Sequence, residues 1–253
     1  MAVIAEGLPV RPVEEGIYSV LPERPHSHLY DGRAAIYDWV VGTRLYNRAV
    51  WGASMSDYVA FAQHAVASDQ AGMLLDAGCG SLLFTARAYL DGQRPILACD
   101  QSLEMLKRAR SRLTKLAGAL PERIFLLQAD LASLPFRPGS FSTAICMNVL
   151  HHLADAGCLV EGLKKLLAGG GHLYLTSLVK GNRLLGDRYL AALHRRGDFV
   201  QPRTGAELEE TLANSFGPHV NVRMHGNMAY ATAVSPVPQS APNQHTHSTP
   251  RGD

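Results

Sequence analysis

A glycine turn between an apolar run and a helical pattern constrains this chain more than any other feature. Residues 74–81 read Leu-Leu-Asp-Ala-Gly-Cys-Gly-Ser, so a short strand runs into Gly78 and Gly80. Glycine permits a tight turn and a close approach of backbone to ligand, and the first turn of a following helix offers unpaired N–H groups to an anion. The segment therefore predicts a strand, a ligand-binding loop and a helix.

Alternating patterns continue on both sides of this turn. Strand-like runs cover residues 73–77, 95–99, 123–128, 142–149, 172–178, 219–225 and 228–234. Helical patterns cover residues 31–50, 55–67, 82–90, 102–116, 154–167 and 204–215, and the glycines at 169–171 are expected to end the fifth of them. The pattern predicts an α/β fold with a Rossmann-like, seven-stranded, mostly parallel sheet, a C-terminal antiparallel hairpin and helices on both faces.

The same patterns suggest four regions. We expect an extended N-terminal arm over residues 1–28, a helical lid over 29–70, a core over 71–234 and a disordered tail over 235–253. The tail is rich in proline and polar residues and has little to bury. His245 and His247 lie in it without a further ligand nearby, so no metal site is expected.

Charge, hydropathy and cysteine spacing argue against several classes of function. The formal net charge is +2, from 24 basic and 22 acidic side chains, which gives no electrostatic case for binding nucleic acid or an anionic membrane. No apolar run reaches the ~18 residues of a membrane span, and the first residues lack a signal-peptide pattern. The four cysteines form no CxxC pair. These features favour a cytoplasmic protein.

Acidic residues end successive predicted strands. Asp100 and Asp130 follow the second and third strands, and Asp76 lies two residues before Gly78. Because ligands bind at the carboxyl ends of parallel strands, these acids should lie close together. Asp100 suits a pair of ribose hydroxyls, Asp130 suits an adenine amino group, and Leu131 can supply an apolar wall.

Two kinds of ligand suit such a site, a dinucleotide and S-adenosylmethionine. A dinucleotide fingerprint needs glycine where this chain has Leu83, and the chain lacks a Tyr-x-x-x-Lys pair. The single carboxylate of S-adenosylmethionine needs a less close approach than a pyrophosphate, and Asp76 can hold its amino group. The residues favour adenosylmethionine. A nicotinamide-dependent oxidoreductase and a non-catalytic adenosylmethionine-binding protein remain alternatives.

With these elements in order, the chain resembles the class I S-adenosylmethionine-dependent methyltransferases, in particular the small-molecule, ubiquinone/menaquinone-type subgroup. The matching segments are residues 74–81, 100–109, 128–136, 141–153 and 169–173. The resemblance implies a cofactor site that comprises Asp76, Gly78, Gly80, Asp100, Gln101, Met105, Asp130, Leu131 and Asn148. Leu82 departs from the family pattern, which has glycine there.

The resemblance also implies methyl transfer to a small-molecule acceptor. His151 or His152 could remove the acceptor's proton, although this pair could equally cap a helix or pack at the strand end. Tyr30 and Tyr37 would belong to a lid over the cofactor. Residues 180–203 are rich in basic side chains, which suggests either a solvated helix face or a lip that recognises an acidic substrate.

Overall fold

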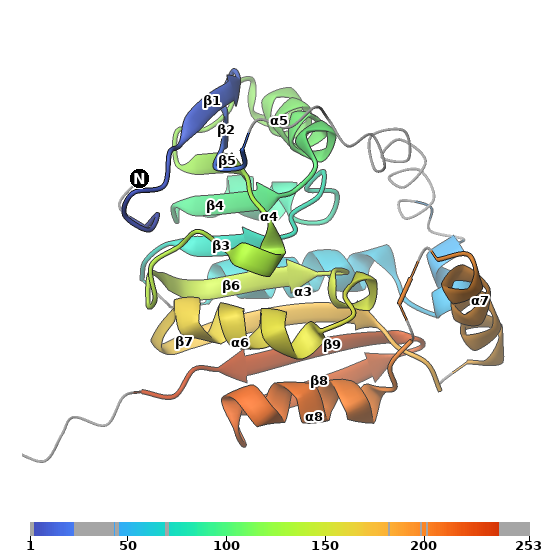
Figure 1. Ribbon diagram of the computed structural model, residues 1–253. Coiled ribbons are helices and arrows are strands. Elements are labelled where there is room, and N and C mark those ends of the chain that lie inside the picture. The colour runs from blue at the N-terminus through green and yellow to red at the C-terminus, as the bar shows by residue number, and fades with distance from the viewer. Residues whose placement is uncertain are drawn as a thin grey trace, which may run out of the picture.

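The computed structural model describes residues 3–22, 43, 46–68, 71–181, 183–197, 199–200 and 202–237. Within these ranges the chain forms one sheet of nine strands in the order β1-β2-β5-β4-β3-β6-β7-β9-β8 (Figure 1). The strands are β1 (Arg11–Glu14), β2 (Ile17–Ser19), β3 (Leu74–Ala77), β4 (Ile96–Asp100), β5 (Ile124–Gln128), β6 (Phe141–Met147), β7 (Leu167–Leu178), β8 (Val220–His225) and β9 (Met228–Val234).

The sheet is parallel from β2 to β7, and β8 and β9 close it as the predicted antiparallel hairpin. The seven predicted strands are all present, but the predicted strand number was wrong by two. The N-terminal arm adds β1 and β2, with Ile17 opposite Leu126 of β5. This pairing satisfies the backbone groups of an otherwise open edge and buries Ile17 completely.

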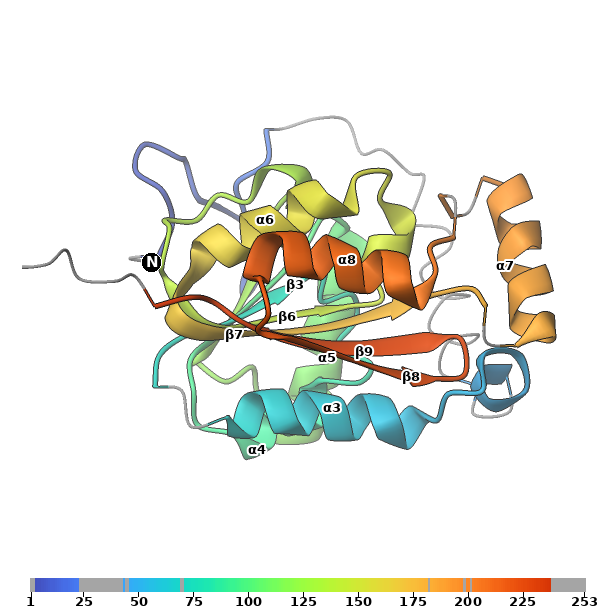
Figure 2. The same ribbon diagram turned by 90° about the horizontal axis from the view of Figure 1, so that it is seen from below.

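Helices cover both faces of the sheet (Figure 2). One face carries α3 (Met55–Ala67), α4 (Ala86–Asp91) and α5 (Leu103–Ala117), and the other carries α6 (Ala156–Leu166) and α8 (Gly205–Phe216). In α5 the buried residues Leu106, Ala109 and Leu113 recur at helical spacing, and Ser102 caps the helix by accepting from the N–H of Met105. Each face therefore encloses its own apolar core.

Two predicted features differ from the structure. The helix expected over residues 82–90 begins only at Ala86, because Leu82 has a left-handed φ of 56° that interrupts the helix. The glycines at 169–171 do not end a helix: α6 ends at Leu166, and they lie inside β7. The pattern over residues 31–50 lies mostly outside the described residues, whose first helical segment is the π-helical turn η1 (Asn47–Trp51).

The path of the chain determines where a ligand can bind. The order β3, β4, β5 runs outward in one direction, and β6 and β7 then continue on the other side of β3. In open α/β sheets the crevice at such a reversal, beyond the carboxyl ends of the strands, is the usual binding site. The turn η1 and helix α7 (Leu184–Arg195) lie beyond this end of the sheet, at the right of Figures 1 and 2.

None of the helices in the described ranges is long and apolar enough to cross a bilayer.

Candidate active site

The glycine turn follows β3 directly. Gly78 has φ of 77°, and a Cβ there would come within 2.5 Å of Val149 Cγ2 and 3.2 Å of Leu131 Cδ1. Gly80 has φ of 53°, and a Cβ there would meet no atom within 4 Å. The first glycine is therefore needed for packing beneath two apolar side chains, while the second borders open space that a ligand can fill.

Asp100 connects this turn to the next helix. Its Oδ2 accepts from the backbone N–H of Gly80 at 2.8 Å, and its Oδ1 accepts from that of Ser102 at 2.9 Å. Burial raises the pKa of Asp100 above its ordinary value, and the N–H groups of Ser102 and Gly80 oppose that rise. The carboxylate thus holds the glycine turn and the start of α5 together.

Asp76 lies beneath the turn, 2% exposed. Its Oδ2 accepts a hydrogen bond of 2.7 Å from the hydroxyl of Tyr89. Burial raises the pKa of Asp76 to about 7, although the Tyr89 hydroxyl acts in the opposite direction. A cation bound nearby would offset the cost of keeping this carboxylate charged.

The other residues predicted to bind the nucleoside lie just after β4 and β5, in the loops and helices that follow these strands. Asp130 caps the short helix η2 (Leu131–Ser133), its Oδ1 accepting from the N–H of Ala132 at 2.9 Å. Met105 and Leu131 are half-buried, while Gln101 is exposed. The backbone carbonyl of Gln101 accepts from Gln128 Nε2 at 3.0 Å, which ties the ends of the two strands together.

Asn148 follows β6 with a left-handed φ of 59°. Its backbone N–H donates to the Thr176 carbonyl at 2.9 Å, and its Oδ1 accepts from the Thr176 hydroxyl at 3.2 Å. These bonds to β7 turn the Asn148 side chain into a cavity of about 50 Å³. The cavity is lined by Tyr46, Asn47, Trp51, Tyr58, Asn148, His151, Leu178, Phe199 and Met228.

His151 lies in the short helix η3 (Leu150–His152), 6% exposed. Its Nδ1 accepts from the Leu178 N–H at 3.4 Å, so the proton of the neutral ring resides on Nε2. Burial, and then the charges of His152 and Arg203, hold the pKa of His151 well below its usual range. The half-buried His152 and the buried His151 both pack against the ring of Phe199, with centroid distances of 4.7 and 4.6 Å.

Arg203, from the segment between α7 and α8, holds the short helix η3 in place. Because η3 contains His151 and His152, we call it the histidine turn. The Arg203 guanidinium donates to the carbonyls of Leu150 at 3.1 Å, Leu153 at 3.0 Å and Ala154 at 3.0 Å. No local sequence pattern singles out Arg203 or Phe199. Only the basic composition of residues 180–203 pointed to their segment.

An aromatic wall closes the cavity on the side of η1. Tyr46, Trp51 and Tyr189 meet edge to face, with centroids 5.5 to 6.1 Å apart, and Tyr58 stacks on Phe84 at 4.5 Å. The lid residues predicted from the sequence, Tyr30 and Tyr37, lie outside the described residues. Among the described residues, no group of three or more His, Cys, Asp or Glu side chains is arranged to hold a metal.

Known sequences resemble part of this chain. Residues 75–175 match the family model for a methyltransferase domain. The chain is 33% identical over 153 residues to a ubiquinone biosynthesis O-methyltransferase of Xanthomonas euvesicatoria pv. vesicatoria, covering 56% of this chain and 61% of that relative. A ubiquinone biosynthesis O-methyltransferase of Xanthomonas campestris pv. campestris (strain B100) is 32% identical over 140 residues, which cover 51% of this chain and 56% of that relative. The chain thus spans about three-fifths of the length of these curated relatives.

Solved structures share the fold at low identity. Phosphoethanolamine N-methyltransferase 2 of Haemonchus contortus, in complex with S-adenosyl-L-methionine, superposes with a TM-score of 0.65 at 15% identity, covering 83% of this chain and 58% of that one. The geranyl diphosphate C-methyltransferase of Streptomyces coelicolor A3(2) gives a TM-score of 0.58 at 14% identity, covering 71% and 76%. Residues 75–175 are therefore similar to methyltransferase domains, and the chain shares the fold of solved methyltransferase structures.

Proposed function

We propose that this protein transfers the methyl group of S-adenosylmethionine to a hydroxyl-bearing small molecule. The observation that carries the proposal is the adjacency of two features at the carboxyl ends of β3 and β6. An open glycine turn flanked by strand-end acids lies beside a cavity that Asn148 and His151 line. One feature suits a nucleoside-bearing cofactor, and the other suits the group that receives the methyl.

The residues present fit the cofactor. We place the methionine end in the open space beside Gly80, near the cavity that Asn148 lines. Asp100 and Asp130 each keep acceptor capacity beyond their backbone bonds, because a carboxylate offers about four lone-pair sites. Asp76, with its pKa near 7, responds to the positive charge of the bound amino acid. The cofactor supplies an already activated methyl, so the protein has to align the acceptor and exclude water.

The hydroxyl acceptor is favoured by the cavity and by the O-methyltransferase names of the curated relatives. His151 presents Nε2–H, which can donate to an acceptor oxygen and hold it in place. To take a proton instead, its ring would have to release the Leu178 N–H or turn. We therefore propose His151 chiefly as the group that orients the acceptor, with proton removal at His152 or solvent.

The decisive experiment is calorimetric. The purified protein should bind S-adenosylhomocysteine with affinity in the micromolar range and should not bind NADH. A methyl-transfer assay over a panel of small hydroxyl compounds would then detect turnover of adenosylmethionine. Binding of NADH without binding of S-adenosylhomocysteine would refute the proposal and favour an oxidoreductase.

A further inference from the structure

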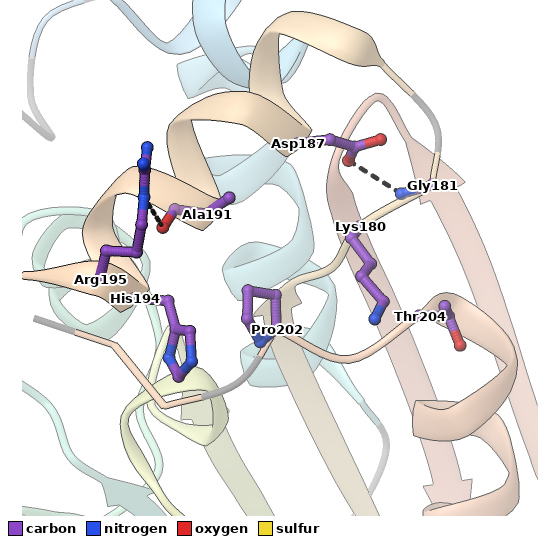
Figure 3. Close-up of a pocket in the computed structure, with 8 residues that line it drawn as sticks. All are labelled: Lys180, Gly181, Asp187, Ala191, His194, Arg195, Pro202 and Thr204. Atoms are coloured by element: carbon purple, nitrogen blue, oxygen red, sulfur yellow. Dashed lines mark hydrogen bonds between the residues drawn. The ribbon is translucent and has the colours of Figure 1, made fainter. Parts of the chain in front are cut away.

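We propose that the acceptor site extends into a cationic groove beneath α7, where Lys180 and His194 bind a carboxylate or phosphate group of the methyl acceptor. The inference rests on the proposed function and names the class of acceptor that it would use. The groove is open to solvent and has a volume of about 640 Å³. Figure 3 shows His194 and Lys180 on either side of Pro202.

The groove is built by two parts of the chain. Asp187, Ala191 and Arg195 recur every four residues and so form one face of α7. The opposite wall is made where Lys180 and Thr204 pair as a parallel bridge, with the Lys180 N–H donating to the Arg203 carbonyl at 2.8 Å. These contacts fix the two walls independently of any ligand.

The groove lining carries two cations, Lys180 and Arg195, against one carboxylate, Asp187. Its lining carboxylate, Asp187, already accepts from the Gly181 N–H at 2.8 Å and from Asn227 Nδ2 at 2.7 Å. No carboxylate in the described part of the chain lies within ion-pair distance of Lys180 or Arg195, and the exposed Glu207 carboxylate, which interacts with Lys180 at longer range, is held by the Thr204 N–H. Arg195 lies along α7 at the rim, with its Nε donating to the Ala191 carbonyl at 3.4 Å (Figure 3).

His194 has a defined orientation in this groove. Its Nδ1 lies 3.1 Å from the Phe199 carbonyl oxygen. A carbonyl can only accept, so Nδ1 must carry the hydrogen, and Nε2 is left for a ligand. When protonated, the ring donates through Nε2 to an anion while keeping its bond to Phe199.

The groove lies next to the cavity that His151 lines, although the two linings have no residue in common. Phe199, which receives the bond from His194, packs its ring on His151 in the cavity. Leu178 lines the cavity and Lys180 lines the groove, and two residues of extended chain span about 7 Å. The cavity of about 50 Å³ holds little more than the reacting group, so the rest of an acceptor has to lie outside it. A compact hydroxy acid or hydroxy phosphate fits this arrangement.

The test uses the full-length protein saturated with S-adenosylhomocysteine. Calorimetry would compare phenol, 3-hydroxybenzoate and 3-hydroxyphenyl phosphate as probes. We expect at least one anionic probe to bind about tenfold or more tightly than phenol, the gain of one charge-assisted contact. The ratio between the two anions shows whether the groove prefers carboxylate or phosphate.

Variants then locate the effect. Lys180→Met and His194→Gln should each reduce the preference for the anion and leave phenol binding unchanged. Arg188→Gln is the matched control, because Arg188 is exposed on α7 and does not line the groove. Equal affinity for phenol and both anions, or an anion preference that survives both variants, would overturn the inference. The same samples report on the proposed function separately, because its failure would appear as loss of S-adenosylhomocysteine binding in the wild type.

Discussion

Leu82 has a backbone conformation that leucine rarely adopts, and the conformation belongs to the loop that the cofactor is proposed to contact. Its φ is 56°, yet its side chain is only 1% exposed and packs in the core beneath α4. A left-handed residue with a Cβ costs roughly 1–2 kcal/mol, whereas a buried leucine side chain contributes more than that. Burial of the side chain therefore outweighs the strain of the turn.

This balance predicts an unusual order of stabilities. Leu82→Ala and Leu82→Gly should both destabilise, but the glycine variant should be the more stable of the two by about 1 kcal/mol, because glycine relieves the strain. Leu106 in α5 is the control, since there the glycine variant should be less stable than the alanine variant by a similar amount. Denaturant unfolding would measure all four variants, and the same order at both positions would contradict the assignment of strain.

The charged Asp76 carboxylate is expected to lower the stability of the folded protein and to strengthen cofactor binding. Its pKa is about 7 in the folded protein and lower when unfolded, so the folded state binds the extra proton and loses stability as pH rises from about 4 to 7. Asp76→Asn removes this loss and should raise the free energy of unfolding at pH 8 by on the order of 1–4 kcal/mol. The variant should gain nothing at pH 3.5, and it should bind S-adenosylhomocysteine more weakly at pH 8. If Asp76→Asn were less stable than the wild type at pH 8, the charged Asp76 carboxylate would not be destabilising the folded protein there.

Asp100 should affect both the fold and the cofactor site. Asp100→Ala removes two backbone hydrogen bonds, each worth about 0.5–3 kcal/mol, and also the proposed ribose contact. We expect a lower melting temperature and an affinity for S-adenosylhomocysteine reduced roughly tenfold to several hundredfold. Asp130→Ala, which loses one cap bond, should destabilise less. Unchanged affinity in a folded Asp100→Ala protein would exclude Asp100 as the ribose ligand.

At the scale of elements, the segment between α7 and α8 shapes the proposed acceptor cavity, because its Phe199 lines that cavity. Arg203 holds the histidine turn, and Phe199 packs on both of its rings. Asn227, in the β8–β9 turn, bonds the Trp51 carbonyl through its N–H and the Asp187 carboxylate through its side chain. Three elements far apart in the chain, η1, α7 and the terminal hairpin, are thereby joined around the proposed acceptor site.

Arg203 offers a direct test of this arrangement. Arg203→Gln should lower kcat about tenfold or more, because the three carbonyls that position the turn lose their donor. Binding of S-adenosylhomocysteine should stay close to wild type, since Arg203 does not contact the glycine turn. Arg196→Gln, an exposed change near the end of α7, serves as the control. Comparable kcat values for the two variants would show that the turn keeps its place without Arg203.

At the scale of the whole molecule, the N-terminal strands are part of the sheet. Ile17 has no exposed surface and packs in the core that α4 and α5 cover. Ile17→Ala should therefore lower the free energy of unfolding by about 2–5 kcal/mol, as for other core positions. Leu8→Ala, at a residue 42% exposed, should change it by less than about 0.5 kcal/mol. A small effect at Ile17 would mean that the arm only lies against the sheet.

Local patterns in the sequence were sufficient to predict most of the sheet and the acids at the ends of its strands. Strand periodicity, the glycine turn and acids at strand ends depend on residues close together in the chain. They predicted seven of the strands, the hairpin and the positions of Asp100 and Asp130 at one edge of the sheet. Local interactions of this kind, such as the capping of α5 by Ser102, can be predicted from sequence because they involve only a few neighbouring residues.

Tertiary structure alone decided the rest. The glycines at 169–171 read as a helix end, but they lie inside β7 at an irregularity in its pairing with β6, where a Cβ on Gly171 would come within 3.1 Å of the Ser142 carbonyl oxygen. The pairing of Ile17 with β5 and the contacts of Phe199 and Arg203 with the histidine turn join residues more than 45 positions apart. Such contacts depend on which surfaces the folded sheet leaves unpaired, and no local pattern of residues encodes that information.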